Sequence, residues 1–147
     1  MTMHRRPLGR GRTLAALAGP LIVAGTVLQW WQVGGTPGIP PESGNGLAGS
    51  GILVFLVGIA AMALVALPYA SGDRPLGLDR PLSFAILSAA GWIGFGWRVV
   101  ELALIGAFQF ATPSDVLTDA PGLWLSAIGL VVLSRATWTM TREPAHR

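Results

Sequence analysis

The sequence predicts an all-α membrane protein, an up-down bundle of four transmembrane helices with both termini on the cytoplasmic side. Hydrophobic residues make up 52% of the 147 residues and charged residues only 12%, about half of the roughly 25% that soluble domains contain. Four apolar segments are each long enough to cross the ~30 Å hydrocarbon core of a bilayer. Lipid offers the backbone no hydrogen-bond partners, so these segments must be helical. We expect one domain over residues 1–147.

The predicted spans are residues 13–31, 47–69, 82–109 and 122–140, with outer segments 32–46 and 110–121 and a cytoplasmic segment 70–81. The first span follows several arginines, as the apolar region of a signal peptide would. Its apolar run is longer than such a region, and it ends in Gln29-Trp30-Trp31 without a small-x-small cleavage site. We therefore favour a retained helix over a cleaved signal. Pro20 is expected to kink this helix.

The placement of the basic residues predicts the orientation. All are arginines, and nine of the ten lie at or near the predicted cytoplasmic side: Arg5, Arg6, Arg10, Arg12, Arg74, Arg80, Arg135, Arg142 and Arg147. The charged residues of the two outer segments are all acidic: Glu42, Asp115 and Asp119. Cytoplasmic loops of membrane proteins carry the excess of arginine and lysine. The use of arginine without lysine also indicates a high-GC bacterial genome, so we expect a bacterial inner membrane.

The two outer segments differ in their predicted structure. The first is rich in glycine and proline over residues 34–41, a composition that predicts neither helix nor strand but an irregular cap. In the second, Thr112 is expected to be a helix N-cap, Pro113 the first helical residue and Asp115 the third. This pattern predicts a short helical turn on the outer surface.

Tryptophans cluster at the predicted membrane surfaces. Trp30 and Trp31 end the first span and Trp124 begins the fourth, all on the outer side. The favoured interpretation is that their amphipathic rings are anchors at the headgroup level. The alternative is that these three residues form the aromatic rim of an outward-facing site.

Arg98 and Glu101 are charged residues within the predicted third span. Arg98 would lie only ~4 Å from the midpoint of residues 82–109 at 1.5 Å per residue, where a charge costs roughly 2.5 to 3.5 kcal/mol on insertion scales. Residues at i and i+3 are neighbours on a helix, so we expect an ion pair. Gln29 and Ser126, also in the outer half, are the predicted further hydrogen-bond partners.

The predicted pair has two interpretations. As a functional site it would bind an anionic or zwitterionic ligand or a lipid headgroup, or relay a proton, because ionisable residues at membrane depth are often functional. As a structural feature it would fix helix register or contact a partner subunit, with the cost of desolvating both groups set against their attraction. A structural or assembly role is slightly favoured.

Several kinds of chemistry lack the residues that they need. The chain has no cysteine, and His4 and His146 lie in the polar tails, so we expect no thiolate site and no histidine-ligated metal or haem within the bundle. Without lysine there is no phosphate-binding P-loop, and neither G-x-S-x-G nor H-E-x-x-H occurs. The arginines are scattered, which argues against nucleic acid. We expect no catalytic residues, no cofactor and no enzyme activity.

The aromatic cluster Gln29-Trp30-Trp31, the glycine- and proline-rich outer segment and the run from Gly122 to Gly129 together resemble small, uncharacterised four-span membrane proteins of actinobacteria. The resemblance implies a fold and a topology, and no catalytic residues. The sequence thus predicts an accessory or assembly subunit or a structural scaffold, with the bilayer and another membrane subunit or a second copy as partners. The alternative function is a lipid or small-amphiphile binding or transport module that uses Arg98 and Glu101.

Overall fold

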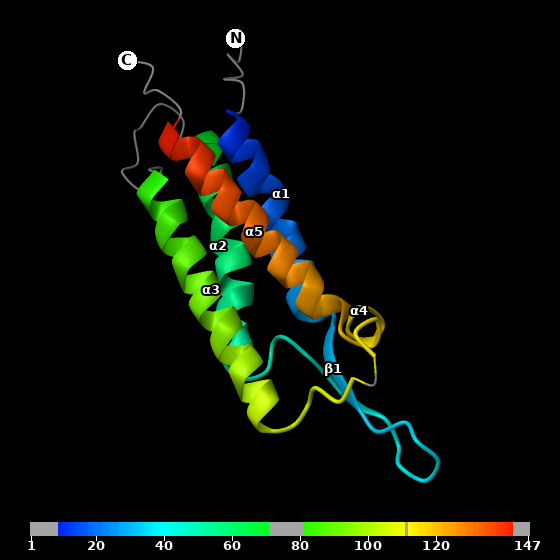
Figure 1. Cartoon of the computed structure of the whole chain (residues 1–147). Helices are drawn as coiled ribbons and strands as arrows, with labels where there is room; N and C mark the ends of the chain where they lie inside the picture. The colour runs from blue at the N-terminus through cyan, green and yellow to red at the C-terminus, as the bar shows by residue number, and fades with distance from the viewer. Residues whose placement is uncertain (1–8, 71–80, 111, 143–147) are drawn as a thin grey trace.

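The computed structural model describes residues 9–70, 81–110 and 112–142. Its elements in chain order are α1 (Arg10–Val27), β1 (Gln29–Val33), β2 (Glu42–Asn45), α2 (Gly51–Ala70), α3 (Pro81–Leu104), α4 (Asp115–Asp119) and α5 (Pro121–Arg142). The four long helices lie side by side, and the start of α1 and the end of α5 lie at the same end (Figure 1). The β-strands and α4 lie at the opposite end.

Three helices, α2, α3 and α5, are long and apolar enough to cross a membrane, by length and composition. They match the second, third and fourth predicted spans. The helix α1 is not among them, because Arg10 and Arg12 lie within its 18 residues and lower its mean hydropathy. The predicted up-down bundle also lacks some elements of the observed fold. Besides the four long helices, the described residues include a short helix and a two-stranded sheet, which are not the short connections of a plain up-down bundle.

The long helices pack in the order α1, α2, α3 and α5, and α5 closes the ring against α1. Buried side chains fill the space between them, among them Phe84, Ile22, Leu130, Leu133 and Val54. Glycines bring α1 close to its neighbours: a Cβ at Gly19 would collide with Met62 of α2, and one at Gly25 would collide with Ser126 of α5. Such small residues are typical of helix packing in membranes.

The predicted first span is too long, because α1 ends at Val27 and the chain continues as a β-hairpin. Strands β1 and β2 pair antiparallel, with Val33 opposite Glu42 and Trp31 opposite Gly44. The run 34–41 is neither helix nor strand, as predicted, but the residues on either side of it pair as strands, which the prediction of an irregular cap did not include. Strand β2 (Glu42–Asn45, ESGN) is polar and has low β-propensity. The indole of Trp31 lies against Gly44, where a Cβ would be 2.7 Å from its Nε1, so this position of β2 has no room for a side chain.

The predicted third span is also too long, because α3 ends at Leu104 rather than at Gln109. Gly106 has φ +70°, and its N–H donates to the Ala103 carbonyl at 3.1 Å. The Ala107 N–H donates to the Leu102 carbonyl at 2.9 Å. These two bonds make a Schellman motif, which stops the helix at a left-handed glycine.

The short outer helix is confirmed as α4, but its predicted start was wrong. Helix α4 begins at Asp115, with Ser114 in the N-cap position and without a side-chain cap. Thr112 does not cap it. Instead the Thr112 N–H and hydroxyl donate to the Asp115 carboxylate, at 2.8 and 2.6 Å.

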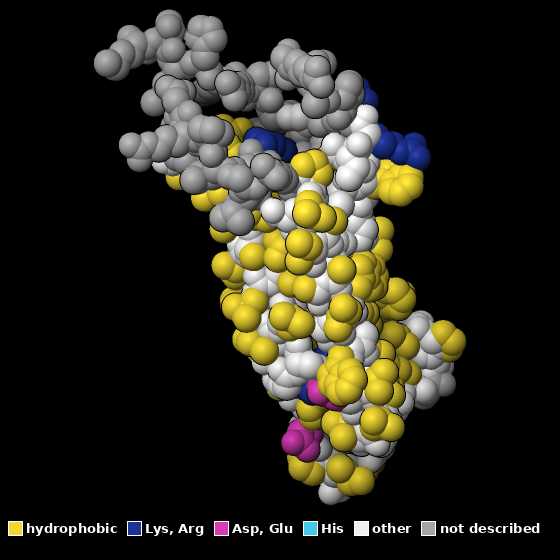
Figure 2. All heavy atoms as spheres, turned by 90° about the vertical axis from the view of Figure 1, so that its left-hand side faces the viewer, with side chains coloured by type: hydrophobic (Ala, Val, Ile, Leu, Met, Phe, Trp, Pro, Cys, Tyr) yellow, Lys and Arg dark blue, Asp and Glu magenta, His cyan; other side chains and the backbone are white. Residues whose placement is uncertain are grey.

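Large hydrophobic side chains are exposed along the length of the helices, among them Leu56, Ile59, Ile86, Ile93 and Val131. Figure 2 shows hydrophobic side chains over the middle of the face that includes α3, while the acidic side chains that belong to described residues on this face lie near one end of it. An apolar middle with charged ends is the surface that a membrane-spanning protein presents.

Candidate functional site

Arg98 and Glu101 form the predicted ion pair. The Arg98 Nη1 donates to Glu101 Oε2 at 3.0 Å, one helical turn apart on α3. The Arg98 side chain is 11% exposed and that of Glu101 34%. The pair therefore points from the buried side of α3 toward its surface.

A second contact joins this pair to α2. The hydroxyl of Ser50, the residue before α2, donates to the same oxygen of Glu101 at 3.0 Å. Gly49 has φ +59°, and a Cβ there would lie 2.8 Å from Arg98 Nη1 and 2.9 Å from Glu101 Oε2. Only a residue without a side chain lets this turn approach the pair so closely. A carboxylate beside the first turn of a helix also suits the positive end of the helix dipole.

The pair lies further from the middle of its helix than the sequence predicted. Because α3 ends at Leu104, Arg98 is six residues from that end, about 9 Å along the axis. The predicted span ran to residue 109 and placed Arg98 almost at its midpoint. A charge near a helix end can reach the headgroup region and costs less than one at the centre.

The structure does not bring Gln29 or Ser126 to the pair. The Gln29 amide donates to the Asp119 carbonyl at 2.8 Å and to Gln32 Oε1 at 2.9 Å, so it links β1 to the end of α4. Ser126 is fully buried where α5 crosses Gly25 of α1, and its hydroxyl has no hydrogen-bond partner. Ser50, which sequence reasoning missed, takes their place. Its signal was a serine directly before an apolar run, the usual N-cap pattern.

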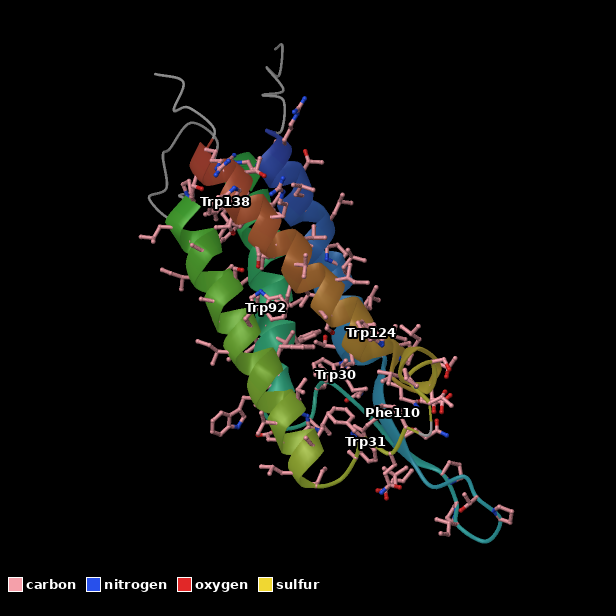
Figure 3. All side chains as sticks on the ribbon, viewed as in Figure 1. Trp30, Trp31, Trp92, Phe110, Trp124 and Trp138 are labelled. Atoms are coloured by element: carbon pink, nitrogen blue, oxygen red, sulfur yellow. The ribbon has the colours of Figure 1, made fainter. Side chains whose placement is uncertain are left out.

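The three outer tryptophans do not form one rim. Figure 3 shows Trp30 and Trp31 at the end of the molecule that carries β1. Trp30 is fully buried, donates its indole N–H to the Gly25 carbonyl at 2.8 Å and packs against Phe95 with ring centroids 5.4 Å apart. It is a core residue and not a surface anchor. Trp31 is half-buried, while Trp124 is 40% exposed and donates to the Val116 carbonyl at 3.2 Å.

A second polar network, which sequence reasoning did not find, joins α3 to α5. The hydroxyls of Ser88 and Ser134 are 2.8 Å apart, and Trp92 Nε1 donates to Ser134 Oγ at 3.0 Å. Trp92 lies midway along the bundle (Figure 3). Ser134 also donates to the Leu130 carbonyl at 2.9 Å. Serine is also a common small residue at helix contacts in membranes, and nothing in one sequence indicates which small residues meet.

The described residues offer little chemistry beyond these contacts. Among them no three histidine, cysteine or acidic residues come together as metal ligands would. Within the Arg98 and Glu101 cluster, Arg98 Nε is buried without a partner and Glu101 Oε2 already accepts two bonds. The geometry is that of a brace between α2 and α3. No family model, curated protein or solved structure matches this chain, so the resemblance to small four-span proteins stays a prediction.

Proposed function

We propose that the chain is a non-catalytic protein of the bacterial inner membrane that works as an accessory or assembly subunit, or as a scaffold, with four spans and both termini in the cytoplasm. Three helices of spanning length support membrane insertion. The fourth span would be α1, which runs beside α2 and α5 and meets them through Gly11, Gly19 and Gly25. Glycine contacts of this kind let membrane helices approach closely.

The charges at the two ends support the orientation. Arg10 begins α1 and Arg142 ends α5 at the same end of the molecule. Glu42 lies in β2 and Asp115 in α4, at the opposite end. Arginine is enriched on the cytoplasmic side of membrane proteins, which assigns the first end to the cytoplasm in this proposal.

The observation that carries the accessory role is the outward face of α3. β-branched residues recur every seventh position along it, Ile86, Ile93 and Val100, with exposed fractions of 60%, 68% and 54%. A second row at the same spacing holds small exposed residues, Ala89, Gly96 and Ala103. Two apolar rows at heptad spacing are the pattern by which a helix packs lengthwise on another.

Gly96 distinguishes this face from the rest of the bundle. A Cβ at Gly96 would meet nothing within 4 Å, whereas one at any other glycine of the described long helices would meet a neighbouring element. The other glycines serve contacts inside the chain. Gly96 would serve a contact outside it, and we assign this face to a transmembrane helix of a partner subunit, which small residues allow to approach.

The partner test compares wild-type, Gly96→Leu and Ala63→Leu proteins by native mass spectrometry of mild-detergent extracts from the native membrane. Ala63 is an exposed alanine on α2 and controls for a bulky apolar side chain elsewhere on the surface. We expect a co-purifying subunit that only Gly96→Leu loses. A wild-type protein that runs as a bare monomer would contradict the accessory role. A second copy as the retained partner would make the face a homodimer contact.

The orientation has its own test, because the chain has no native cysteine. A cysteine at Thr36, in the turn between β1 and β2, should react with a membrane-impermeant maleimide on intact spheroplasts. A cysteine at Ser71, in the predicted cytoplasmic segment, should react only after permeabilisation. The reverse pattern would contradict the proposed topology.

The alternative function is a lipid or small-amphiphile binding module at Arg98 and Glu101. The exposed third of the Glu101 side chain favours it. The unpartnered Nε of Arg98 is buried and does not reach a ligand. Arg98→Ala should then abolish retention of a bound ligand while the protein still inserts. Unchanged ligand content would eliminate this alternative.

A further inference from the structure

An open groove of about 440 Å³ lies between α3 and α5, outside the Arg98 and Glu101 cluster. Ala85, Ala89 and Trp92 of α3 form one wall, and Thr137, Trp138 and Thr141 of α5 form the other. Figure 3 places Trp92 midway along the bundle and Trp138 near the end where α5 stops. The groove therefore runs from the middle of the bundle to the end that carries Arg10 and Arg142.

The hydroxyls in this groove donate their hydrogens within the protein. Ser134 donates to the Leu130 carbonyl at 2.9 Å, Thr137 to the Leu133 carbonyl at 3.0 Å and Thr141 to the Trp138 carbonyl at 2.8 Å. The Trp92 indole N–H is bound to Ser134. Because these donors are satisfied, the surface they leave is apolar in character and suits a hydrocarbon chain rather than a polar ligand.

Arg142 lies at one end of the groove, against the lining residue Trp138. The Arg142 guanidinium carbon lies 4.4 Å from the centroid of the Trp138 ring. Among the described residues no carboxylate pairs with Arg142, and its guanidinium lies against the face of the Trp138 ring. Arg135, Trp138 and Arg142 follow one another at i, i+3 and i+7 along α5, which puts a second arginine on the same stripe of the helix.

We propose that this groove binds one anionic glycerophospholipid, with an acyl chain along α3 and α5 and the phosphate at Arg142. The proposal rests on the proposed function, which places this end at the cytoplasmic leaflet, where anionic lipids attract basic residues. Charge complementarity selects the occupant, because an apolar groove with a cation at one end matches an apolar chain that ends in an anion. The volume of about 440 Å³ lies within the ~300–1,000 Å³ of small-ligand sites.

The test is a titration of the delipidated full-length protein in detergent with dioleoylphosphatidylglycerol or dioleoylphosphatidylcholine, read by native mass spectrometry. The wild-type protein should bind one phosphatidylglycerol about fivefold more tightly than phosphatidylcholine, the ratio expected for one arginine near an anionic group. Arg142→Gln should remove this preference. Arg10→Gln, which removes an exposed arginine at the same end, should keep it. Ala85→Phe, which fills the groove, should weaken the binding of both lipids.

Three results would overturn the inference. Equal binding of the two lipids by the wild-type protein would show ordinary boundary lipid. Equal effects of Arg142→Gln and Arg10→Gln would show attraction by net charge instead of a site. Unchanged binding in Ala85→Phe, with a native circular dichroism spectrum, would place the lipid elsewhere.

The titration in detergent does not depend on how the chain is oriented in a membrane. Correct maleimide labelling without a lipid preference would therefore overturn this inference and leave the proposed topology intact. Reversed labelling with the preference present would overturn the topology and leave the groove as a lipid site.

Discussion

Ser50 and Glu101 are 51 residues apart in the sequence, and the Ser50 hydroxyl donates to the Glu101 carboxylate at 3.0 Å. The contact places a carboxylate of α3 beside the first turn of α2, whose backbone N–H groups lack partners within the helix. Arg98 donates to the same carboxylate oxygen. The ion pair is thus joined to the start of α2 through Ser50, a contact between the two helices that involves no ligand.

Removal of the Ser50 hydroxyl should weaken this contact. Ser50→Ala is expected to lower the free energy of unfolding by about 1 kcal/mol, as the loss of one side-chain hydrogen bond does. Ser43→Ala, at an exposed serine of β2, is the matched control and should have no effect. The measurement is unfolding by sodium dodecyl sulfate in mixed micelles, followed by circular dichroism. Equal stability of the two variants would contradict a stabilising contact between Ser50 and Glu101.

The two members of the ion pair should not behave independently. Glu101→Ala leaves the buried Arg98 guanidinium without its partner and should destabilise the protein more than Ser50→Ala. Replacement of both residues, Arg98→Leu with Glu101→Leu, should recover part of that loss because no unpaired charge remains. The same micelle unfolding measures the series. A double variant less stable than Glu101→Ala would show that the arginine stabilises the fold without its partner.

Removal of the Ser126 hydroxyl, unlike that of Ser50, should not lower the stability of the protein. Its hydroxyl is fully buried without a hydrogen-bond partner, so Ser126→Ala removes a desolvated polar group and should leave stability unchanged or raise it by about 1 kcal/mol. Gly25→Ala, on the facing side of the same crossing, should separate α1 from α5, because its Cβ would collide with the Ser126 backbone. Thermal unfolding of the two variants in detergent compares them. A large loss in Ser126→Ala would restore Ser126 as a functional candidate.

The sequence predicted what hydropathy and local spacing determine. Three long apolar helices and the pairing of Arg98 with Glu101 at i and i+3 are of this kind. It did not predict contacts between distant segments. Gln29 begins β1 just after the end of α1, and Ser126 lies in the outer part of α5, but packing turned Gln29 toward α4 and Ser126 toward α1. The Ser50 contact depends on how α2 sits against α3, which no single segment specifies.

Helix ends were missed for a related reason. Apolar residues continue in the sequence past Val27 and past Leu104, so the predicted spans were extended beyond the ends of α1 and α3. The structure ends α3 by the backbone conformation of Gly106. It ends α1 by a hairpin whose second strand is polar and has Gly44 close to the Trp31 indole. Because α3 ends earlier than predicted, Arg98 lies further from the middle of its helix. The expected free-energy cost of its charge in the membrane is therefore lower.

Alanine should have opposite effects on stability at Gly96, within α3, and at Gly106, in the turn that ends α3. Gly106→Ala should destabilise the protein by about 1 kcal/mol, because an L-residue is strained at φ +70° although its Cβ would meet no atom within 4 Å. Gly96→Ala should stabilise the isolated chain by about 0.5–1 kcal/mol, because alanine favours a helix and Gly96 faces open space. Micelle unfolding measures both. A loss of stability in Gly96→Ala would mean that this face is already packed within one chain.

Trp30 and Trp124 distinguish a core tryptophan from a surface one. Trp30→Phe should cost about 1–3 kcal/mol, because the substitution leaves a gap in a fully buried site and removes the bond to the Gly25 carbonyl. Trp124→Phe keeps an aromatic ring at a position that is 40% exposed and should cost far less. Micelle unfolding gives the stabilities, and the emission lost in each variant reports the surroundings of its indole. A buried indole emits at shorter wavelength, so the light lost in Trp30→Phe should be bluer than that lost in Trp124→Phe. Equal costs and equal emission would restore the view that both tryptophans are anchors at the membrane surface.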